Sequence, residues 1–373
     1  MIMPLEGLKV AVLLERGVNE IEFHYSRLRL REAGAEVLLV GNDRLDYTGE
    51  DHTRLHADVT IDQVDAADFD GVVVPGGLAP EKLRQNPQVV RFVRELYDRG
   101  KICAAICHGQ QVFISAGLLR GRRVVSAWSM VDDMVFAGAE HVEDVHAVRD
   151  GTLVTARYPQ DLPAFFHLVL EAFAETEGRS LPLDYGQRLW DRRFGIIAER
   201  ATDATQLFYA RYRIEEEGGT VLLLGREANA EVQLGSPTWE WAEHGPTTKI
   251  DRSLDDVEAA QFDGLIIPGG LGTWLIRGHR GLQKLVREMD VAHKPIAAIE
   301  RGPKVLLSAG ILTGRTVTCS GEMRDDLIAA GLSYCDEPIV RDEYLLFCQG
   351  TEALPEWGRA WIEMWEKIVP QCE

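Results

Sequence analysis

A cysteine within a run of small residues is the first group in this chain that could do chemistry. Residues 104–109 read AAICHG, so Cys107 stands between an apolar stretch and a glycine. A nucleophile with small neighbours at a strand-to-helix junction is typical of the sharp turn that presents a hydrolase nucleophile to its cleft. The N-terminus of the following helix would favour the thiolate, the reactive form of cysteine. We therefore expect Cys107 to be a nucleophile.

The same run occurs a second time without the thiol. Residues 297–302 read AAIERG, so Glu300 takes the place of Cys107 at a spacing of 193 residues (300 − 107). The same spacing relates the Pro-Gly-Gly of residues 75–77 to that of residues 268–270. We interpret the chain as a duplicated domain in which one copy keeps a reactive thiol and the other has lost it.

The two copies differ in length. Gly34 and Gly218, which end the first expected helix of each copy, are 184 residues apart (218 − 34), so the second copy has nine extra residues (193 − 184) further along. These fall between Gly225 and Asp255. That segment contains Trp239, Trp241 and His244.

The order of apolar segments predicts the fold. Strands are expected at residues 8–14, 36–40 and 102–106 of the first copy and at residues 194–198 and 220–224 of the second, with a helix at residues 87–99. Near-continuous apolar strands that alternate with helices are typical of a parallel sheet covered on both faces. Ligands bind such sheets beyond the carboxyl ends of the strands, where Cys107 is expected.

These elements divide the chain into two domains. We expect two tandem flavodoxin-like three-layer α/β/α sandwich domains with mostly parallel sheets, at residues 1–176 and 192–373. The polar segment of residues 177–191, which the repeat does not match, is the expected linker.

Composition excludes several classes of function. The formal net charge of −19 argues against a nucleic-acid partner. The N-terminus lacks a basic stretch followed by an apolar run, and no apolar stretch could cross a bilayer, so we expect neither a signal peptide nor a membrane partner. Six cysteines in a chain of 373 residues form no disulfide framework, which predicts a cytoplasmic protein. Four of them are expected to be small buried hydrophobes: Cys103, Cys319, Cys335 and Cys348.

The motifs together resemble the ThiJ/PfpI superfamily. The pattern is Pro-Gly-Gly, then Ala-x-Cys-His-Gly, with an early glutamate, and it covers nearly the whole chain, once per copy. The superfamily includes the deglycase linked to Parkinson's disease, PfpI-type intracellular proteases and glyoxalase III enzymes. The tandem arrangement is similar to that of two-domain plant glyoxalases. The resemblance implies chemistry without a cofactor, and we find no residue spacing typical of a metal site.

The resemblance implies a role for three residues beside Cys107. The family's early glutamate, here Glu22, is hydrogen-bonded to the cysteine sulfur, and a carboxylic acid in such a pocket should be protonated and able to relay protons. His108 would complete a Cys-His-Glu set with Glu81, which in PfpI-like hexamers comes from an adjacent subunit. Neighbouring Glu20 is expected to face solvent.

Backbone groups near the thiol are expected to bind the substrate's oxygen. The N–H groups of Gly76, Gly77 and His108 are candidates for an oxyanion site, because glycines let the main chain approach a ligand closely. The chain departs from the PfpI pattern at two places, where Ala127-Trp128 replaces a tyrosine and Asn19 replaces a further acid. Both changes concern the choice of substrate.

The second copy has lost every reactive group. Its counterparts of Cys107, His108, Glu81 and Glu22 are Glu300, Arg301, Trp274 and Gln206. We interpret this copy as a catalytically inactive partner in which Glu300 pairs with Arg301 or another base. The alternative is a pocket for a small polar molecule anchored by Arg301 and lined by tryptophans. Those tryptophans would be Trp239, Trp241 and Trp274.

Three functions remain open. The first is a glyoxalase-like or deglycase-like enzyme whose Cys107 attacks an aldehyde such as methylglyoxal. The second is a PfpI-like peptidase or amidase with a peptide substrate, and the third is a stress protein whose Cys107 is oxidised. The resemblance also implies a homo-oligomer, either a dimer or a trimer of two-domain chains. A glutamine amidotransferase is disfavoured, since its late His-x-Glu pair is absent and residues 158–160 read YPQ.

Overall fold

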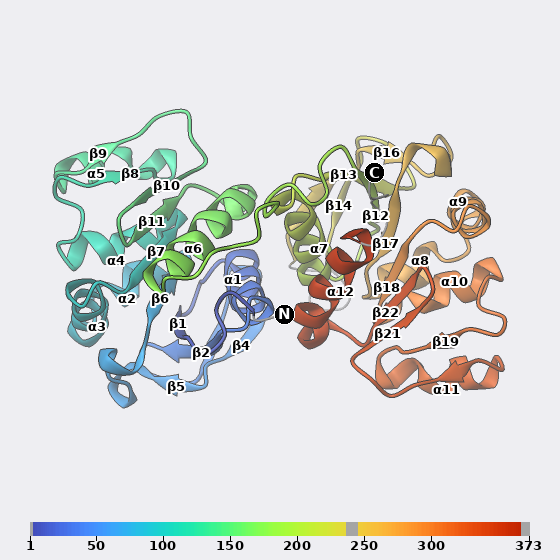
Figure 1. Cartoon of the computed structure of the whole chain (residues 1–373), viewed down its shortest axis with the longest axis horizontal. Helices are drawn as coiled ribbons and strands as arrows, with labels where there is room; N and C mark the ends of the chain where they lie inside the picture. The colour runs from blue at the N-terminus through green and yellow to red at the C-terminus, as the bar shows by residue number, and fades with distance from the viewer. Residues whose placement is uncertain (1–2, 236–244, 367–373) are drawn as a thin grey trace. The chain divides into compact units, whose positions relative to one another are not determined.

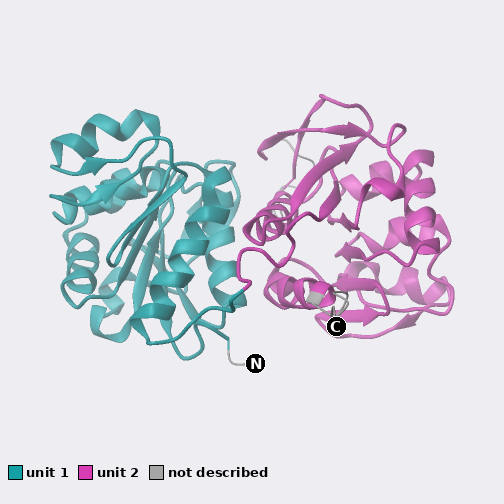
Figure 2. Cartoon of the chain, turned by 45° about the horizontal axis from the view of Figure 1, so that its top comes forward, with its two compact units in different colours: residues 1–183 teal, residues 184–373 magenta. Residues whose placement is uncertain are grey.

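The structure is a computed structural model that describes residues 3–235 and 245–366 (Figure 1). It divides into two compact units, residues 1–183 and 184–373 (Figure 2). The division lies within the segment of residues 177–191 that the sequence indicated as a linker. Trp239 and Trp241 lie outside the described residues, as does His244.

The first unit contains a seven-stranded sheet with the order β10-β11-β7-β6-β1-β2-β5. Neighbouring strands of this sheet run parallel except β10 and β11. The elements of this unit are β1 (Lys9–Leu14), α1 (Glu20–Glu32), β2 (Glu36–Gly41), β3 (Asp46–Thr48), β4 (Arg54–His56), β5 (Val59–Thr60), β6 (Gly71–Val74), α2 (Ala79–Leu83), α3 (Pro87–Asp98), β7 (Ile102–Ile106), α4 (Gln110–Ser115), β8 (Arg123–Val124), α5 (Val131–Phe136), β9 (Glu140–His141), β10 (Ala147–Asp150), β11 (Leu153–Ala156) and α6 (Leu162–Thr176).

The second unit repeats this topology. Its sheet has the order β16-β13-β12-β17-β18-β22-β21, and β21 and β22 form the antiparallel pair. The elements of this unit are β12 (Arg193–Ile197), α7 (Ala204–Glu216), β13 (Thr220–Gly225), β14 (Glu231–Gln233), β15 (Thr247–Lys249), β16 (Arg252–Ser253), β17 (Gly264–Ile267), α8 (Gly272–Ile276), α9 (Arg280–Val291), β18 (Ile296–Ile299), α10 (Pro303–Ala309), β19 (Thr316–Val317), α11 (Arg324–Ala329), β20 (Ser333–Tyr334), β21 (Ile339–Asp342), β22 (Leu345–Cys348) and α12 (Leu354–Glu366).

Helices cover both faces of each sheet. In the first unit α1 and α6 pack together on one face, and α2, α3 and α4 pack together on the other (Figure 1). The central strands β6 and β7 are buried along their whole length, as expected for parallel strands covered on two sides. The predicted fold, two tandem flavodoxin-like α/β/α domains with mostly parallel sheets, is confirmed.

Most of the extra residues of the second copy fall, in sequence, between the two strands of one hairpin. In the hairpin of β3 and β4, the amide of Gly49 donates to the carbonyl of Thr53, and in that of β14 and β15 the amide of Leu234 donates to the carbonyl of Pro246. In sequence, three residues (50–52) therefore separate these two positions in the first copy and eleven (235–245) in the second. The excess of eight residues, together with one more before β14, accounts for the nine.

The described cysteines are all free. Cys103, Cys319 and Cys348 are buried, whereas Cys335 is half-buried, in contrast to the expectation that it lies in the core. Among the described helices, none is both long enough and apolar enough to span a membrane.

Candidate active site

Cys107 lies at a strained turn directly after the buried strand β7. The residue begins a short 3-10 turn, Cys107–Gly109, that leads into α4, and its φ of 58° is in the left-handed region. Such a conformation costs a residue other than glycine on the order of 1–3 kcal/mol and persists only where the surrounding structure holds it. The turn places the thiol beyond the carboxyl end of the strand, as the motif predicted.

Glycines at two positions allow this turn to form. A Cβ atom at Gly109 would lie 2.1 Å from the carbonyl oxygen of Val74. A Cβ atom at Gly76 would lie 2.6 Å from the Cβ atom of Cys107 and 2.9 Å from Oε2 of Glu22. Neither position tolerates a side chain, because backbone and buried groups surround both.

Glu22 is fully buried next to the turn at residues 107–109, which we call the elbow. It lies in the first turn of α1, where the Asn19 side chain caps the helix by accepting the Glu22 amide at 3.1 Å. The amide of Gly76 donates to Glu22 Oε2 at 2.6 Å, whereas Oε1 is buried without an oxygen or nitrogen partner among the described residues. Burial raises the pKa of Glu22 to about 8, so the carboxyl group is neutral at pH 7 and Oε1 is the oxygen left to carry its proton.

The same surroundings act on the thiol. Burial raises the pKa of Cys107, the charge of ionised Glu22 raises it further, and the backbone N–H groups of Gly77 and His108 lower it. The two amides act in the direction expected of a helix N-terminus, but burial outweighs them. Because Glu22 is neutral below about pH 8, its repulsion of a thiolate is absent there.

The roles expected of Gly76 and Gly77 therefore separate. The amide of Gly76 is occupied by Glu22, so it is not the oxyanion donor that the sequence indicated. The amides of Gly77 and His108 are directed at the sulfur of Cys107. A substrate carbon attacked by Cys107 would bond to this sulfur, so the two amides would lie near the oxygen of that carbon. Gly77 has a φ of 76°, and a Cβ atom there would lie 2.4 Å from the carbonyl oxygen of Gly17.

His108 contacts the thiol even though it is the next residue in the chain. Its Nδ1 lies 3.3 Å from Cys107 Sγ, and its Nε2 lies 3.4 Å from Ser129 Oγ. Adjacent residues of a regular helix would point apart, but the left-handed residue at the elbow turns the two side chains toward each other. Sequence reasoning missed Ser129, since only the tertiary structure brings it to the imidazole.

Glu81 is not brought to this site within the chain. It lies exposed in the short helix α2, and no described hydrogen bond or ion pair joins its carboxylate to Cys107 or His108. Its backbone carbonyl accepts a hydrogen bond from Gln85. A role for Glu81 at a cysteine site therefore requires a second copy of the chain.

Glu20 is buried, in contrast to the expectation that it faces solvent. Only 6% of its surface is exposed, and its Oε1 accepts hydrogen bonds from the amides of Asp51 (2.8 Å) and Thr53 (3.4 Å). Burial and the charge of Asp51 raise the pKa of Glu20 to about 8. The carboxyl group fixes the tip of the β3–β4 hairpin against the start of α1, and Glu50 of this tip accepts a hydrogen bond from Asn19.

Trp128, at which the chain departs from the PfpI pattern, contacts Tyr158. The Trp128 amide donates to the Tyr158 hydroxyl at 2.8 Å, and the indole of Trp128 is 80% exposed. Trp128 is adjacent to Ser129, whose hydroxyl contacts His108. The sequence drew attention to both residues but gave no sign that they contact each other.

The second copy keeps the elbow and replaces its chemistry. Glu300 has a φ of 58°, equal to that of Cys107. Gln206 occupies the place of Glu22: its Oε1 accepts the amide of Gly269 at 2.7 Å and its Nε2 donates to Glu300 Oε2 at 2.7 Å. Glu300 pairs with Arg301 at 3.1 Å, so the structure contains the ion pair that the sequence suggested.

Trp274 does not line the pocket beside Glu300, in contrast to the alternative raised by the sequence. It lies half-exposed in α8 with two cations over its ring, the guanidinium of Arg301 at 5.6 Å and the ammonium of Lys304 at 5.1 Å. Trp274 thus contacts Arg301 without lining the pocket. Among the described residues, no group of three or more His, Cys, Asp or Glu side chains is arranged to hold a metal ion.

Comparison with known proteins gives close relatives. A deglycase of Pyrococcus horikoshii is 41% identical over 158 residues, which are 42% of this chain and 95% of that protein. Protein DJ-1 homolog D of Arabidopsis thaliana is 28% identical over 301 residues, which are 76% of this chain and 73% of that protein. Protein/nucleic acid deglycase 2 of Escherichia coli is 37% identical over 161 residues, covering 42% of this chain and 92% of that protein.

Solved structures match one domain at a time. DJ-1beta of Drosophila melanogaster is 29% identical and covers 46% of this chain and 92% of its own, with a TM-score of 0.43. The model of the DJ-1/PfpI family matches residues 8–172 and again residues 193–364. The chain therefore belongs to the DJ-1/PfpI family, and it carries two copies of the family's domain.

Proposed function

We propose that this protein is a cysteine-dependent enzyme that acts on reactive 2-oxoaldehydes such as methylglyoxal, with one active site per chain at Cys107. Two features support the proposal. Relatives over the length of one domain are named deglycases. The thiol stands beside a buried carboxyl group that is neutral at pH 7.

The proposed reaction needs no external oxidant. A bond forms between Cys107 Sγ and the aldehyde carbon, and the thiol proton passes to the carbonyl oxygen, which gives a hemithioacetal. A proton then moves from the former aldehyde carbon to the neighbouring ketone carbon, and the hydroxyl proton of the hemithioacetal passes to the former ketone oxygen. The first carbon is thereby oxidised and the second reduced, and a thioester of a 2-hydroxy acid results. Water breaks the C–S bond and releases the 2-hydroxy acid and the free thiol.

The placement of Glu22 carries this proposal more than any other observation. The proton transfers of this reaction need a group that donates and accepts near neutral pH, and a carboxyl group with a pKa of about 8 meets that need. The hydrogen bond from Gly76 holds Oε2, so Oε1 is the atom assigned to the protons. The amides of Gly77 and His108 would stabilise the developing oxyanion.

The contact of His108 with the thiol supports a second candidate, a peptidase or amidase. A Cys–His pair at 3.3 Å can transfer the thiol proton to the imidazole and later to a leaving amine. The acyl group of a peptide would then be held on Cys107 as a thioester until water releases it. Both candidates use the same residues, so the substrate distinguishes them.

Turnover of methylglyoxal by the purified full chain tests the proposal. We expect Cys107→Ser to abolish formation of lactate, and Cys335→Ser, a matched change at a half-buried free cysteine of the second unit, to leave it intact. Lactate formation that survives Cys107→Ser would overturn the proposal. A fluorogenic peptide assayed on the same samples decides between glyoxalase and peptidase.

Assembly and location belong to the same proposal. We propose that the chain forms a homo-oligomer, because the carboxylate of Glu81 is exposed and the family resemblance places it at the Cys-His pair of another copy. We also propose a cytoplasmic location, where a reducing environment would keep the thiol of Cys107 free.

A further inference from the structure

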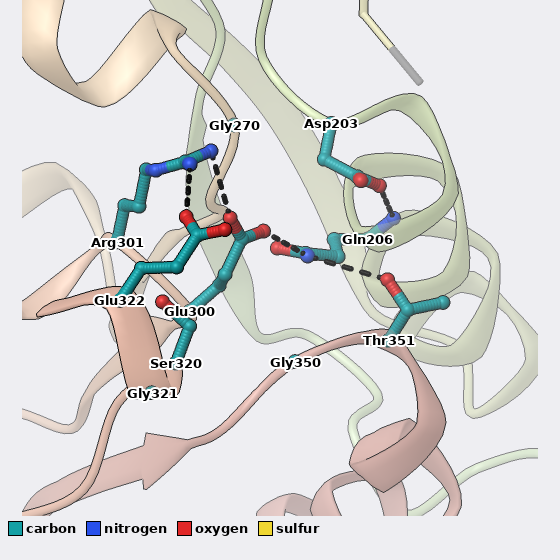
Figure 3. A pocket seen from close by; sticks show the side chains of 10 residues that line it. All are labelled: Asp203, Gln206, Gly270, Glu300, Arg301, Ser320, Gly321, Glu322, Gly350 and Thr351. Atoms are coloured by element: carbon teal, nitrogen blue, oxygen red, sulfur yellow. Dashed lines mark hydrogen bonds and ion pairs between the residues drawn. The ribbon is translucent and has the colours of Figure 1, made fainter. Parts of the chain in front are cut away.

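The second unit contains a cavity where the first unit has its thiol site. It has a volume of about 400 Å³, and Glu300 lies at its centre (Figure 3). All ten lining residues are polar or glycine: Asp203, Gln206, Gly270, Glu300, Arg301, Ser320, Gly321, Glu322, Gly350 and Thr351. We call this cavity the second-copy pocket.

Two bulky residues of the first copy are glycines at the second-copy pocket. Gly321 begins a 3-10 turn at the position where Trp128 begins one in the first copy. Gly350 is the counterpart of Tyr158. Strand β11 pairs with β7 in the same register in which β22 pairs with β18, and this pairing sets the spacing between the copies there at 192 residues (350 − 158). In the first copy the backbone amide of Trp128 donates to the Tyr158 hydroxyl, and with glycine at the position of Tyr158 this hydrogen bond has no counterpart in the second copy. Neither glycine places a side chain at the pocket.

The polar groups of the pocket form an ordered set. Gln206 Nε2 donates to Glu300 at 2.7 Å and to Thr351 Oγ1 at 3.3 Å, and Arg301 bridges Glu300 and Glu322 at 3.1 Å and 2.6 Å (Figure 3). Bonds from both sides thus hold the Glu300 carboxylate in one orientation. Such a set keeps the lining rigid without filling the space.

One hydroxyl at the pocket has no partner. Ser320 Oγ is buried and makes no hydrogen bond within the described part of the chain. A buried hydroxyl left without a partner costs about 1–3 kcal/mol. Ser320 itself belongs to the lining of the second-copy pocket.

The charges of the lining favour a cation. Three carboxylates, those of Asp203, Glu300 and Glu322, face a single guanidinium, and that guanidinium already pairs with two of them. An anion would therefore meet more repulsion than attraction. A small ligand with several donors and one positive charge would satisfy the carboxylate and hydroxyl acceptors together.

We propose that the second-copy pocket binds a small molecule that carries a primary ammonium group at one end of a short chain and a hydroxyl group at the other. The site is separate from the thiol chemistry, so it does not depend on what Cys107 does. It also gives the second unit a role other than that of an inactive partner.

Calorimetric titration of the full chain with three five-carbon probes tests the proposal. The probes are 5-aminopentan-1-ol, pentane-1,5-diol and 5-hydroxypentanoate, which share a hydroxyl group at one end and have an ammonium, a hydroxyl or a carboxylate group at the other. We expect the amine to bind and the diol to bind about tenfold more weakly, because a charge-assisted hydrogen bond is about twice as strong as a neutral one. The carboxylate is expected not to bind.

The release of protons on binding provides a second readout. Burial and the charge of Glu300 raise the pKa of Asp203 to about 7, so part of this carboxyl group is protonated at neutral pH. A bound ammonium stabilises the ionised form, and protons should be released on binding. The binding heat at pH 7 should therefore depend on the ionisation enthalpy of the buffer, and this dependence should vanish in Asp203→Asn.

Two substitutions locate the binding. Gly350→Tyr restores the phenol of the first copy and should abolish binding of the amine, and Glu300→Gln should weaken it about tenfold. The control is Gly278→Tyr, an equally large change at an exposed glycine where a Cβ atom meets nothing within 4 Å. Unfolding midpoints of all variants show whether each remains folded.

Three results would overturn the proposal. They are equal or tighter binding of the diol or the carboxylate, binding of the amine that survives Gly350→Tyr, and no binding of any probe at millimolar concentration. Activity at Cys107 need not change in any of these cases, so failure here is distinguishable from failure of the proposed function.

Discussion

The amide of Gly76 holds the carboxyl group of Glu22 at 2.6 Å, on the side of the glycine that also faces Cys107. In the second unit Gly269 holds Gln206 in the same way at 2.7 Å. The chain thus has a glutamate in one copy and its neutral isostere, glutamine, in the other, each bonded to the equivalent backbone amide. Comparing the two positions indicates what the charge of Glu22 contributes.

The first prediction concerns stability and the charge of Glu22. The ordinary pKa of 4.5 is raised to about 8 in the folded protein, so folding favours the neutral form. The stability associated with that neutral form is present below about pH 4.5 and is lost as pH rises through about 8. We expect Glu22→Gln to raise the free energy of unfolding relative to the unmodified chain at about pH 9, by roughly 1–3 kcal/mol, and to change it little at about pH 4.5.

Urea denaturation at the two pH values measures this difference. The reverse change, Gln206→Glu, places a second carboxylate against Glu300 and should destabilise the protein most at high pH. An effect of Glu22→Gln that is equal at both pH values would mean that the carboxyl group is not neutral in the folded state.

The second prediction concerns the pH dependence of activity. If neutral Glu22 donates the proton, kcat/KM for methylglyoxal should fall as pH rises through about 8. Glu22→Gln should lower kcat/KM by about 100-fold or more and remove this limb of the profile. A rate that continues to climb above pH 9 in the unmodified enzyme would indicate that thiol ionisation alone controls the reaction.

The third prediction concerns the hairpin tip held by Glu20. Glu20→Ala introduces the residue that the second copy has as Ala204, and it removes the acceptor of the amides of Asp51 and Thr53. We expect a loss of about 1–2 kcal/mol of stability and faster hydrogen exchange at these two amides. Glu20→Gln keeps an acceptor oxygen and should preserve the protection. Equal exchange in all three proteins would show that another contact holds the tip.

The fourth prediction concerns assembly. We expect light scattering to give a mass of two or three chains for the native protein. Glu81→Gln should lower kcat without changing that mass, because the side chain is exposed and contacts no catalytic group of its own chain. A monomer with full activity, or an unchanged kcat in Glu81→Gln, would contradict the proposed role of Glu81.

Particular residues show which features of the structure can be predicted from the sequence. The repeated AAI run and the two Pro-Gly-Gly turns predicted a sharp turn in each copy, and the structure has a φ of 58° at both Cys107 and Glu300. Glu20 shows the limit of prediction from sequence, because a charged residue in the first turn of a helix is expected to be exposed. Its burial depends on a hairpin about 30 residues later whose amides need an acceptor.

The sequence by itself determined the duplication, the α/β fold of each copy and the loss of the thiol from the second, because repeats, apolar periodicity and residue identity are local properties of the chain. Only the tertiary structure decided that the amide of Gly76 donates to Glu22 and that the Ser129 hydroxyl contacts His108. It also decided that the second copy surrounds Glu300 with an open polar pocket. These relations join residues that are far apart in the chain, and such contacts exist only once the sheet brings its loops to one edge.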